Sequence, residues 1–173
     1  ATLGPHQGEL STAECRKIID DIASFASPTV ILTGGEPLMR GDLFEIIRYG
    51  NEKGLRLVIA VNGTLLDKDR ALKLKDLGIK RVSMSVDGKD GLSHDAFRGV
   101  RGAFDAVVTA AKALNDVGLP FQINTTVTRL NVGDLGEIYE FVKAIGAVAS
   151  HVFLLVPVGR GEGLRGEELN TKM

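Results

Sequence analysis

Runs of apolar, β-branched residues alternate with helical patterns along the whole chain, and this alternation restricts the fold more than any other feature. The sequence predicts strands over residues 29–33, 56–61, 81–86, 121–126 and 151–156. It predicts helices over residues 42–53, 67–77, 102–117 and 134–145, after a first helix that opens with a capping box of Ser11 and Glu14. Repeated strand–helix units of this kind build a parallel sheet with its helices outside.

Glycine follows four of the predicted helices, where a left-handed C-cap prefers it. These positions are Gly54, Gly78, Gly118 and Gly146. Five strands are too few for a closed barrel of about eight strands. The sequence therefore predicts an α/β fold, either an open doubly wound sheet or a partial barrel.

Composition narrows the class of protein. The chain has 173 residues, 44% of them hydrophobic and 5% aromatic, which suits one domain with an aliphatic core. A net charge of −1, with both signs interspersed, argues against a nucleic-acid interface or a membrane surface. No apolar run reaches the roughly 20 residues of a membrane span, and residues 1–8 lack the apolar core of a signal peptide, so a cytoplasmic location is expected.

Metal and disulfide chemistry have few candidates. Cys15 is the single cysteine, so an intrachain disulfide is excluded, and we expect it to be a structural thiol. His6, His94 and His151 lack the spacing of metal ligands and are expected to be surface or hydrogen-bonded residues.

The turn after the first predicted strand brings two glycines, a carboxylate and a proline to the strand end. Gly34 and Gly35 let the backbone approach a ligand closely, and Pro37 fixes the exit of the turn. Glu36 adds a negative charge, so a cation such as a substrate ammonium is the expected partner. The alternative is a tight strand-to-helix turn with a surface glutamate.

Polar and apolar residues alternate in the third and fourth predicted strands. The polar positions are Arg81, Ser83, Ser85, Asp87, Gln122, Asn124, Thr126 and Thr128. If the apolar faces meet the helices, these side chains line a common interior. Because an unpaired buried polar group costs about 1–3 kcal/mol, such an interior needs water or a polar ligand. The alternative is that the polar side chains hydrogen-bond to one another.

Turns that leave the other strands also carry polar groups. Asn62 and Gly63 follow the second strand, Asp87 and Gly88 follow the third, and a glycine-rich run from Gly159 follows the last. In α/β folds ligands bind at the carboxyl ends of the strands. The sequence therefore predicts a ligand site at that edge.

Together these motifs resemble the core of a radical S-adenosylmethionine (radical SAM) enzyme, over nearly the whole chain. The resemblance implies a partial (βα)6 TIM-like barrel of parallel strands that lacks its first βα unit. It also implies one core-domain fragment over residues 1–173, with about five βα units and a polar tail over residues 159–173. In this family a motif similar to residues 33–37 receives the cofactor's methionine ammonium through backbone carbonyls and the glutamate.

The resemblance assigns further cofactor contacts. Asn62 is similar to the residue that commonly ends the family's next strand. Ser85 and Asp87 would contact the carboxylate or the ribose of S-adenosylmethionine. Arg98 would reach a carboxylate, or else cap its own loop.

The last two strands supply the remaining contacts that the resemblance implies. Asn124 and Thr126 would flank the ribose or the substrate, and Leu155 and Val156 would pack against the adenine.

The chain departs from the family pattern at its metal site. The family binds a 4Fe-4S cluster through three cysteines spaced C-x3-C-x2-C, whereas this chain contains Cys15 alone. The resemblance therefore implies a fragment whose cluster ligands lie upstream of Ala1, and it assigns no metal ligand within the chain. The alternative is a relative of the family that binds no cluster.

For the intact protein, the resemblance implies cleavage of S-adenosylmethionine to a 5′-deoxyadenosyl radical, with an electron donor as a partner. The segment from Leu154 to Gly161 is similar to branches that modify tetrapyrroles, as in haem or haem d1 synthesis, or ribosomal peptides. Two alternatives remain: a non-catalytic α/β domain that binds an amine-bearing metabolite, and a scaffold barrel. Without a preceding strand, residues 29–33 would form an open edge, so we expect self-association through it.

Overall fold

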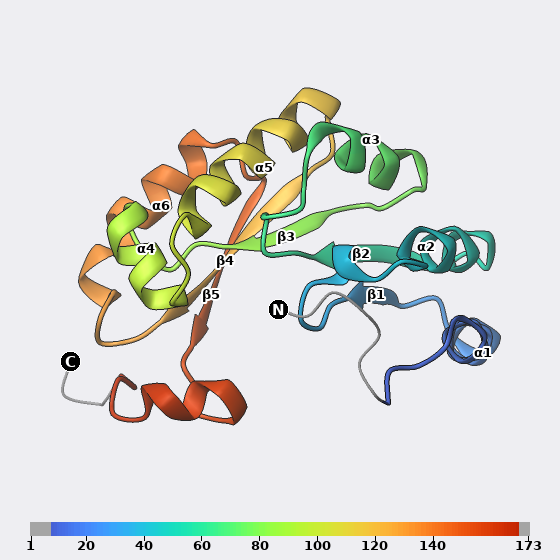
Figure 1. Cartoon of the computed structure of the whole chain (residues 1–173), viewed down its shortest axis with the longest axis horizontal. Helices are drawn as coiled ribbons and strands as arrows, with labels where there is room; N and C mark the ends of the chain where they lie inside the picture. The colour runs from blue at the N-terminus through green and yellow to red at the C-terminus, as the bar shows by residue number, and fades with distance from the viewer. Residues whose placement is uncertain (1–7, 170–173) are drawn as a thin grey trace.

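The computed structural model describes residues 8–169, which form one curled sheet of five parallel strands (Figure 1). The strands are β1 (Thr29–Leu32), β2 (Arg56–Ala60), β3 (Val82–Ser85), β4 (Phe121–Val127) and β5 (Ala149–Leu154). They lie side by side in chain order, and each neighbouring pair is parallel. This arrangement confirms the predicted α/β partial barrel.

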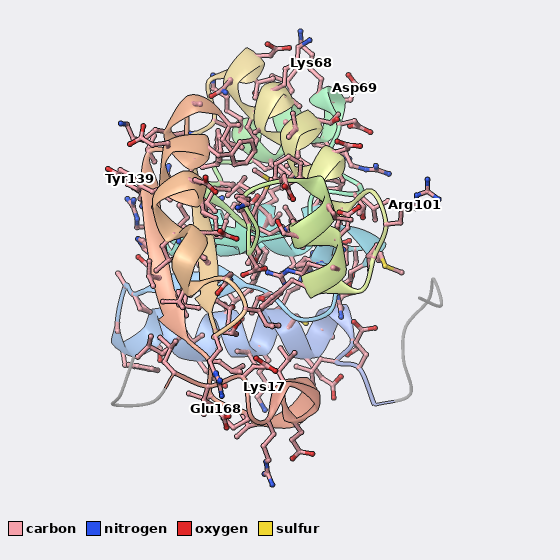
Figure 2. The ribbon with its side chains drawn as sticks, turned by 90° about the vertical axis from the view of Figure 1, so that its left-hand side faces the viewer. Lys17, Lys68, Asp69, Arg101, Tyr139 and Glu168 are labelled. Atoms are coloured by element: carbon pink, nitrogen blue, oxygen red, sulfur yellow. The ribbon has the colours of Figure 1, made fainter. Side chains whose placement is uncertain are left out.

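Helices lie on the outer side of the curl (Figure 1). Within the described residues the α-helices are α1 (Thr12–Phe25), α2 (Leu43–Glu52), α3 (Lys68–Asp76), α4 (Gly91–Arg98), α5 (Ala103–Val117) and α6 (Leu135–Ala144). Short 3-10 helices are η1 (Pro37–Met39), η2 (Val132–Asp134) and η3 (Gly159–Leu164). In Figure 2 the labelled Lys68 and Arg101 extend outward at the rim of the molecule.

Local capping explains where the helices begin and end. The predicted capping box of α1 is present: Ser11 Oγ accepts the Glu14 N–H at 3.3 Å, and Glu14 Oε2 accepts the Ser11 N–H at 2.8 Å. Gly118 ends α5 with a φ of 65°, in the left-handed region that glycine adopts without strain. Helix α4 was not predicted, although Asp90 and Ser93 form a capping box at its start.

The core lies between the convex face of the sheet and the helices. Val82 of β3 and Phe121 of β4 are at most 1% exposed, whereas Gln122 and Asn124 on the opposite face are half-buried. The alternation therefore sorts the two faces as predicted. Part of the polar face also pairs internally, since the Gln122 Nε2 group donates to Asn124 Oδ1 at 3.1 Å and Arg81 Nη1 donates to Gln122 Oε1 at 3.2 Å.

Strand β5 lies two residues earlier than predicted. Its pairing with β4 runs from Gln122 opposite Ala149 to Val127 opposite Leu154, and the ladder stops where β4 ends. Leu155 and Val156 therefore follow the strand, although the Leu155 N–H still donates to the Val127 carbonyl at 3.1 Å.

Both edges of the sheet are open within the described residues, because β1 pairs only with β2 and β5 only with β4. Ile31 on β1 is 59% exposed and Leu154 on β5 is 66% exposed. Among residues 8–169, we find no helix with the length and apolar character needed to cross a membrane.

Candidate functional site

The side chain of Glu36 joins the carboxyl end of β1 to that of β2. Its Oε2 atom accepts the Asn62 N–H at 2.7 Å, and its Oε1 atom accepts the Leu38 N–H at 3.1 Å. In β2 the N–H groups of Ile59 and Val61 point to β3. The Asn62 N–H, which alternates with them, points to the β1 side and meets the carboxylate there. Glu36 thus extends the contact between the two strands past the end of their ladder.

Burial raises the pKa of Glu36, while the hydrogen bonds from the Asn62 and Leu38 N–H groups oppose that rise. An ionised carboxylate offers about four acceptor positions, and the two backbone bonds use two of them. The remaining positions can accept from a cation.

The turn from Thr33 to Gly35 is exposed beside this carboxylate. The backbone groups of Gly34 and Gly35 hydrogen-bond to none of the described residues. A Cβ at either glycine would meet nothing within 4 Å, and the φ of Gly34 is 147°, a value that other residues rarely adopt. The turn therefore presents free carbonyl groups next to a negative charge, which is an arrangement suited to an ammonium group.

The turn after β2 is held by its own side chains. Asn62 Oδ1 accepts hydrogen bonds from the backbone N–H of Thr64 at 2.9 Å and from its hydroxyl at 2.7 Å. Gly63 has a φ of 86°, and a Cβ there would lie 3.3 Å from backbone atoms of Ala106 and Val107 in α5. Here the structure uses the Asn62 backbone N–H for the site and its side chain for the turn.

Three polar groups of Asp87, which follows β3, form hydrogen bonds within the protein, and the fourth, buried Oδ2, has an ion-pair contact without hydrogen-bond geometry. Its N–H donates to His94 Nδ1 at 3.0 Å, and its carbonyl accepts from Asn131 Nδ2 at 2.9 Å. Its Oδ1 atom accepts the Thr126 N–H at 2.7 Å. Its Oδ2 atom forms an ion pair with Arg98 Nη2 at 2.5 Å.

This arrangement separates the roles of Asp87 and Arg98. The Asp87 side chain is 0% exposed, so a ligand cannot contact it without displacing protein groups. The Arg98 side chain is 37% exposed and keeps guanidinium N–H groups available for a ligand carboxylate. Asp87 therefore holds Arg98, whose guanidinium hydrogen-bonds to no carbonyl of its own loop within residues 8–169.

Other predicted site residues lie on the concave face close to the same edge. Ser85 of β3 pairs in register with Asn124 of β4, and Thr126 follows two residues later. All three are half-buried, and the hydroxyls of Ser85 and Thr126 hydrogen-bond to none of the described residues. Leu155 is half-buried just beyond β5, and Val156 is 65% exposed.

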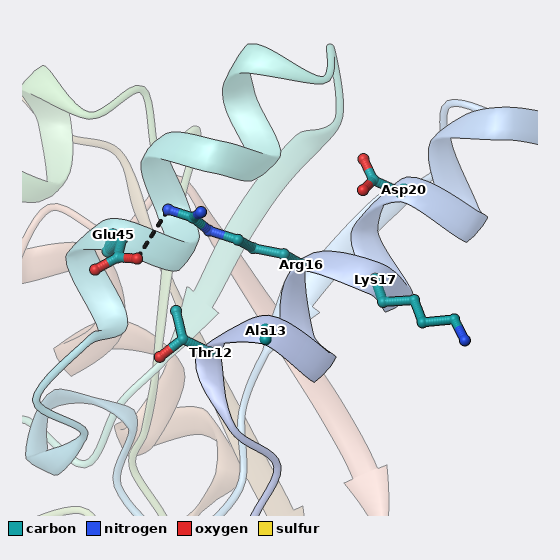
Figure 3. Close-up of a pocket in the computed structure, with 6 residues that line it drawn as sticks. All are labelled: Thr12, Ala13, Arg16, Lys17, Asp20 and Glu45. Carbon is teal, nitrogen blue, oxygen red and sulfur yellow. Dashed lines mark hydrogen bonds and ion pairs between the residues drawn. The ribbon is translucent and has the colours of Figure 1, made fainter.

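Two hollows among the described residues lie away from these side chains. One, of about 420 Å³, lies between α1 and α2 and is crossed by an ion pair between Arg16 and Glu45 at 2.8 Å (Figure 3). The other, of about 280 Å³, lies between the loop after β2 and α5. None of the predicted site residues lines either of these two hollows.

No group of three or more His, Cys, Asp or Glu side chains within residues 8–169 could hold a metal ion. Cys15 is half-buried on α1 and packs against the core. The described residues therefore do not fit an iron–sulfur cluster, and the predicted ligands upstream of Ala1 stay a prediction.

Sequence reasoning missed two buried residues that hold Asp87. His94 is 1% exposed and Asn131 is 4% exposed, and both bond to the backbone of Asp87. A single buried polar residue produces no periodic pattern, so only the capping signal of Asp90 and Ser93 indicated that His94 lies on a helix.

Comparisons with known proteins agree with this geometry. Residues 2–142 match the model of the Radical SAM superfamily. An AdoMet-dependent heme synthase of Nitratidesulfovibrio vulgaris is 47% identical over 171 residues, which is 99% of this chain and 47% of that protein. Another AdoMet-dependent heme synthase, from Methanosarcina barkeri, is 49% identical over 155 residues, covering 90% of this chain and 44% of that protein.

A solved structure of anSMEcpe with bound AdoMet and the Cp18Cys peptide has the same fold. Its TM-score is 0.74 at 23% identity, and the match covers 95% of this chain and 49% of that one. The present chain spans about half the length of the curated relatives that it matches.

Proposed function

Because the chain belongs to the radical SAM superfamily, we propose that its carboxyl-edge site binds S-adenosylmethionine and that the protein is a radical SAM enzyme acting on a tetrapyrrole. Two relatives near 50% identity are named AdoMet-dependent heme synthases, and these names support a tetrapyrrole as the substrate. The peptide alternative was drawn from residues 154–161, and the solved structure with a bound peptide, at 23% identity, speaks for the fold alone.

One observation carries the binding proposal. Glu36 is fixed by two backbone N–H groups and still has acceptor capacity, and it adjoins the unpaired backbone of Gly34 and Gly35. A methionine ammonium has three donors, which the carboxylate and the exposed carbonyls can accept together. Pro37 begins η1 and fixes the course of the chain directly after the carboxylate.

The other predicted contacts follow the same edge. Arg98 would bind the carboxylate of S-adenosylmethionine, with the Ser85 hydroxyl as a second donor. Asn124 and Thr126 would meet the ribose hydroxyls from the concave face. Leu155 and Val156 would supply apolar surface for the adenine.

Further partners belong to the proposal. We assign the ligands of a 4Fe-4S cluster to residues outside the described part, and we expect an electron donor and a cytoplasmic location, where thiols are kept reduced. The roles derived for the described residues are to bind and orient the cofactor. The bulk of the hard chemistry belongs to the cofactors themselves.

Calorimetric titration of the purified protein tests the binding proposal. We expect S-adenosylmethionine to bind more tightly than 5′-methylthioadenosine, which lacks the amino-acid part. Glu36→Gln should lower the affinity for S-adenosylmethionine and leave the affinity for 5′-methylthioadenosine unchanged. The exposed control Glu140→Gln should change neither affinity. Equal affinity for both compounds, or no binding of either, would contradict the proposal.

A further inference from the structure

Helix α4 is attached to the end of β3 through His94. The ring is 1% exposed, and its Nδ1 atom accepts the Asp87 N–H at 3.0 Å. An imidazole that accepts at Nδ1 must be neutral and carry its proton on Nε2. The backbone of α4 also passes close to the end of β3, because a Cβ at Gly88 would lie 2.3 Å from the backbone nitrogen of His94.

The same helix is attached to Asp87 a second time. Arg98 lies four residues after His94, on the same face of α4, and pairs with the Asp87 carboxylate. Asp87 therefore holds two successive turns of α4, one through its backbone N–H and the other through its carboxylate. A shift of the His94 contact would move the Arg98 guanidinium with it.

We propose that His94 is a positioning residue: by accepting the Asp87 N–H, it holds α4 so that Arg98 faces the carboxylate of the bound cofactor. This inference rests on the proposed function. His94 need not touch the cofactor, since it acts through Asp87 and Arg98.

The contact makes the site sensitive to acid. Burial lowers the pKa of His94. The negative charges of Asp87 and Asp95 oppose this shift, and the positive charge of Arg98 adds to it. From α5, the uncharged ring of Phe104 packs against the imidazole. Protonation of Nδ1 would remove the acceptor for the Asp87 N–H. Cofactor binding is therefore intact above the ordinary histidine pKa of 6.5 and weakens as pH falls through the lowered value.

Two substitutions separate a positioning role from simple packing. In His94→Asn the amide oxygen can take the place of Nδ1 without titrating, whereas His94→Leu leaves the Asp87 N–H unpaired. By calorimetry at pH 8, we expect His94→Leu to bind S-adenosylmethionine about tenfold or more weakly and His94→Asn to stay within about threefold of wild type. As the pH falls from 8, wild type should lose more affinity for S-adenosylmethionine than His94→Asn, because protonation of Glu36 affects both proteins and protonation of His94 affects wild type alone.

The exposed His151 supplies the control, and His151→Asn should keep the wild-type pH profile. If His94→Leu does not fold, the pH profiles of wild type and His94→Asn decide the question. Identical profiles for these two proteins would overturn the inference, as would equal affinities of wild type and a folded His94→Leu.

An NMR measurement separates this inference from the proposed function. The ring nitrogens of His94 should report an Nε2–H tautomer at pH 7 without any cofactor, and a proton on Nδ1 would overturn the inference alone. If wild type fails to bind S-adenosylmethionine, the proposed function falls and the inference falls with it.

Discussion

The side-chain amide of Asn131 donates from Nδ2 to the backbone carbonyl of Asp87 at 2.9 Å. The same nitrogen donates to the Thr126 carbonyl at 2.9 Å, and Oδ1 accepts the Thr128 N–H at 2.8 Å. One buried amide thus ties the end of β3 to the end of β4. The edge that carries Arg98 is therefore in place before any ligand arrives, which reduces the ordering cost of binding.

Replacing this amide should destabilise the protein. Asn131→Ala leaves two carbonyls and an N–H group without partners, so we expect a loss of about 2 kcal/mol in the free energy of unfolding. Urea denaturation measures this loss. The exposed Asn115, whose Nδ2 donates to the Ile145 carbonyl at 2.8 Å, is the matched control. An equal effect of Asn115→Ala would contradict the importance assigned to burial.

The ion pair of Asp87 and Arg98 should show strong coupling. Arg98→Met leaves the fully buried Asp87 carboxylate without its cation. We expect the free energy of unfolding to fall by about 2 kcal/mol, a value that already allows for the partial exposure of Arg98. In Asp87→Asn the amide oxygen can still accept the Thr126 N–H, so adding this change to Arg98→Met should recover part of the loss. A double-mutant cycle measured by thermal or urea unfolding checks the coupling, and additive effects would refute it.

The raised pKa of Glu36 predicts a stability profile opposite to that of a salt-bridged carboxylate. Its folded pKa lies above the ordinary value of 4.5, so its contribution to stability is fully present below that value and is lost as pH rises through the folded pKa. Glu36→Gln should flatten this part of the profile. Urea unfolding at several pH values from 4 to 7 gives the comparison, and an unchanged slope in the variant would contradict the assignment.

Two glycines should respond differently to alanine. At Gly88 a Cβ would lie 2.3 Å from the backbone nitrogen of His94 and 2.7 Å from the backbone carbonyl carbon of Ser93, so Gly88→Ala should cost about 1–3 kcal/mol of stability. At Gly35 a Cβ meets open space, so Gly35→Ala should change stability by less than about 0.5 kcal/mol. Gly35→Ala should nevertheless lower the affinity for S-adenosylmethionine, because the methyl group would enter the proposed site. Paired unfolding and calorimetry experiments distinguish these outcomes.

The open edge of β1 predicts self-association of this 173-residue chain. Ile31 is 59% exposed on that edge strand, and a lysine there should block pairing with a second copy. Sedimentation velocity should show dimers or larger species for wild type and mainly monomer for Ile31→Lys. Leu72→Lys, at an exposed position on α3, should leave the distribution unchanged. A wild type that stays monomeric at high concentration would contradict the prediction.

Repetition in the sequence explains why the fold could be predicted. Predicted helix limits fell within one residue at α2, α3, α5 and α6, and caps such as Asp67 and Gly118 mark some of these ends. Strand β5 was shifted because Leu155 and Val156 have the composition of a strand, while the ladder depends on where β4 stops. The strand end is thus set by a partner far away in sequence, which local composition does not encode.

For the site, the glycine-rich turn and the position of Glu36 could be predicted, but the contacts around Asp87 could not. The motif assigned Asp87 to the ligand, whereas its carboxylate is occupied by Arg98 and the Thr126 N–H. His94 and Asn131 reach the same residue from different segments. Such convergence of single polar residues on one backbone unit is visible only in three dimensions.

The order of the sheet also bears on how the chain is made. Each strand pairs with the one synthesised just before it, so a growing polypeptide can add one strand and its helix at a time as it leaves the ribosome. At every stage the newest strand is the one whose outer side still lacks a neighbour. Interruption of translation between units would therefore leave a shorter sheet of the same design.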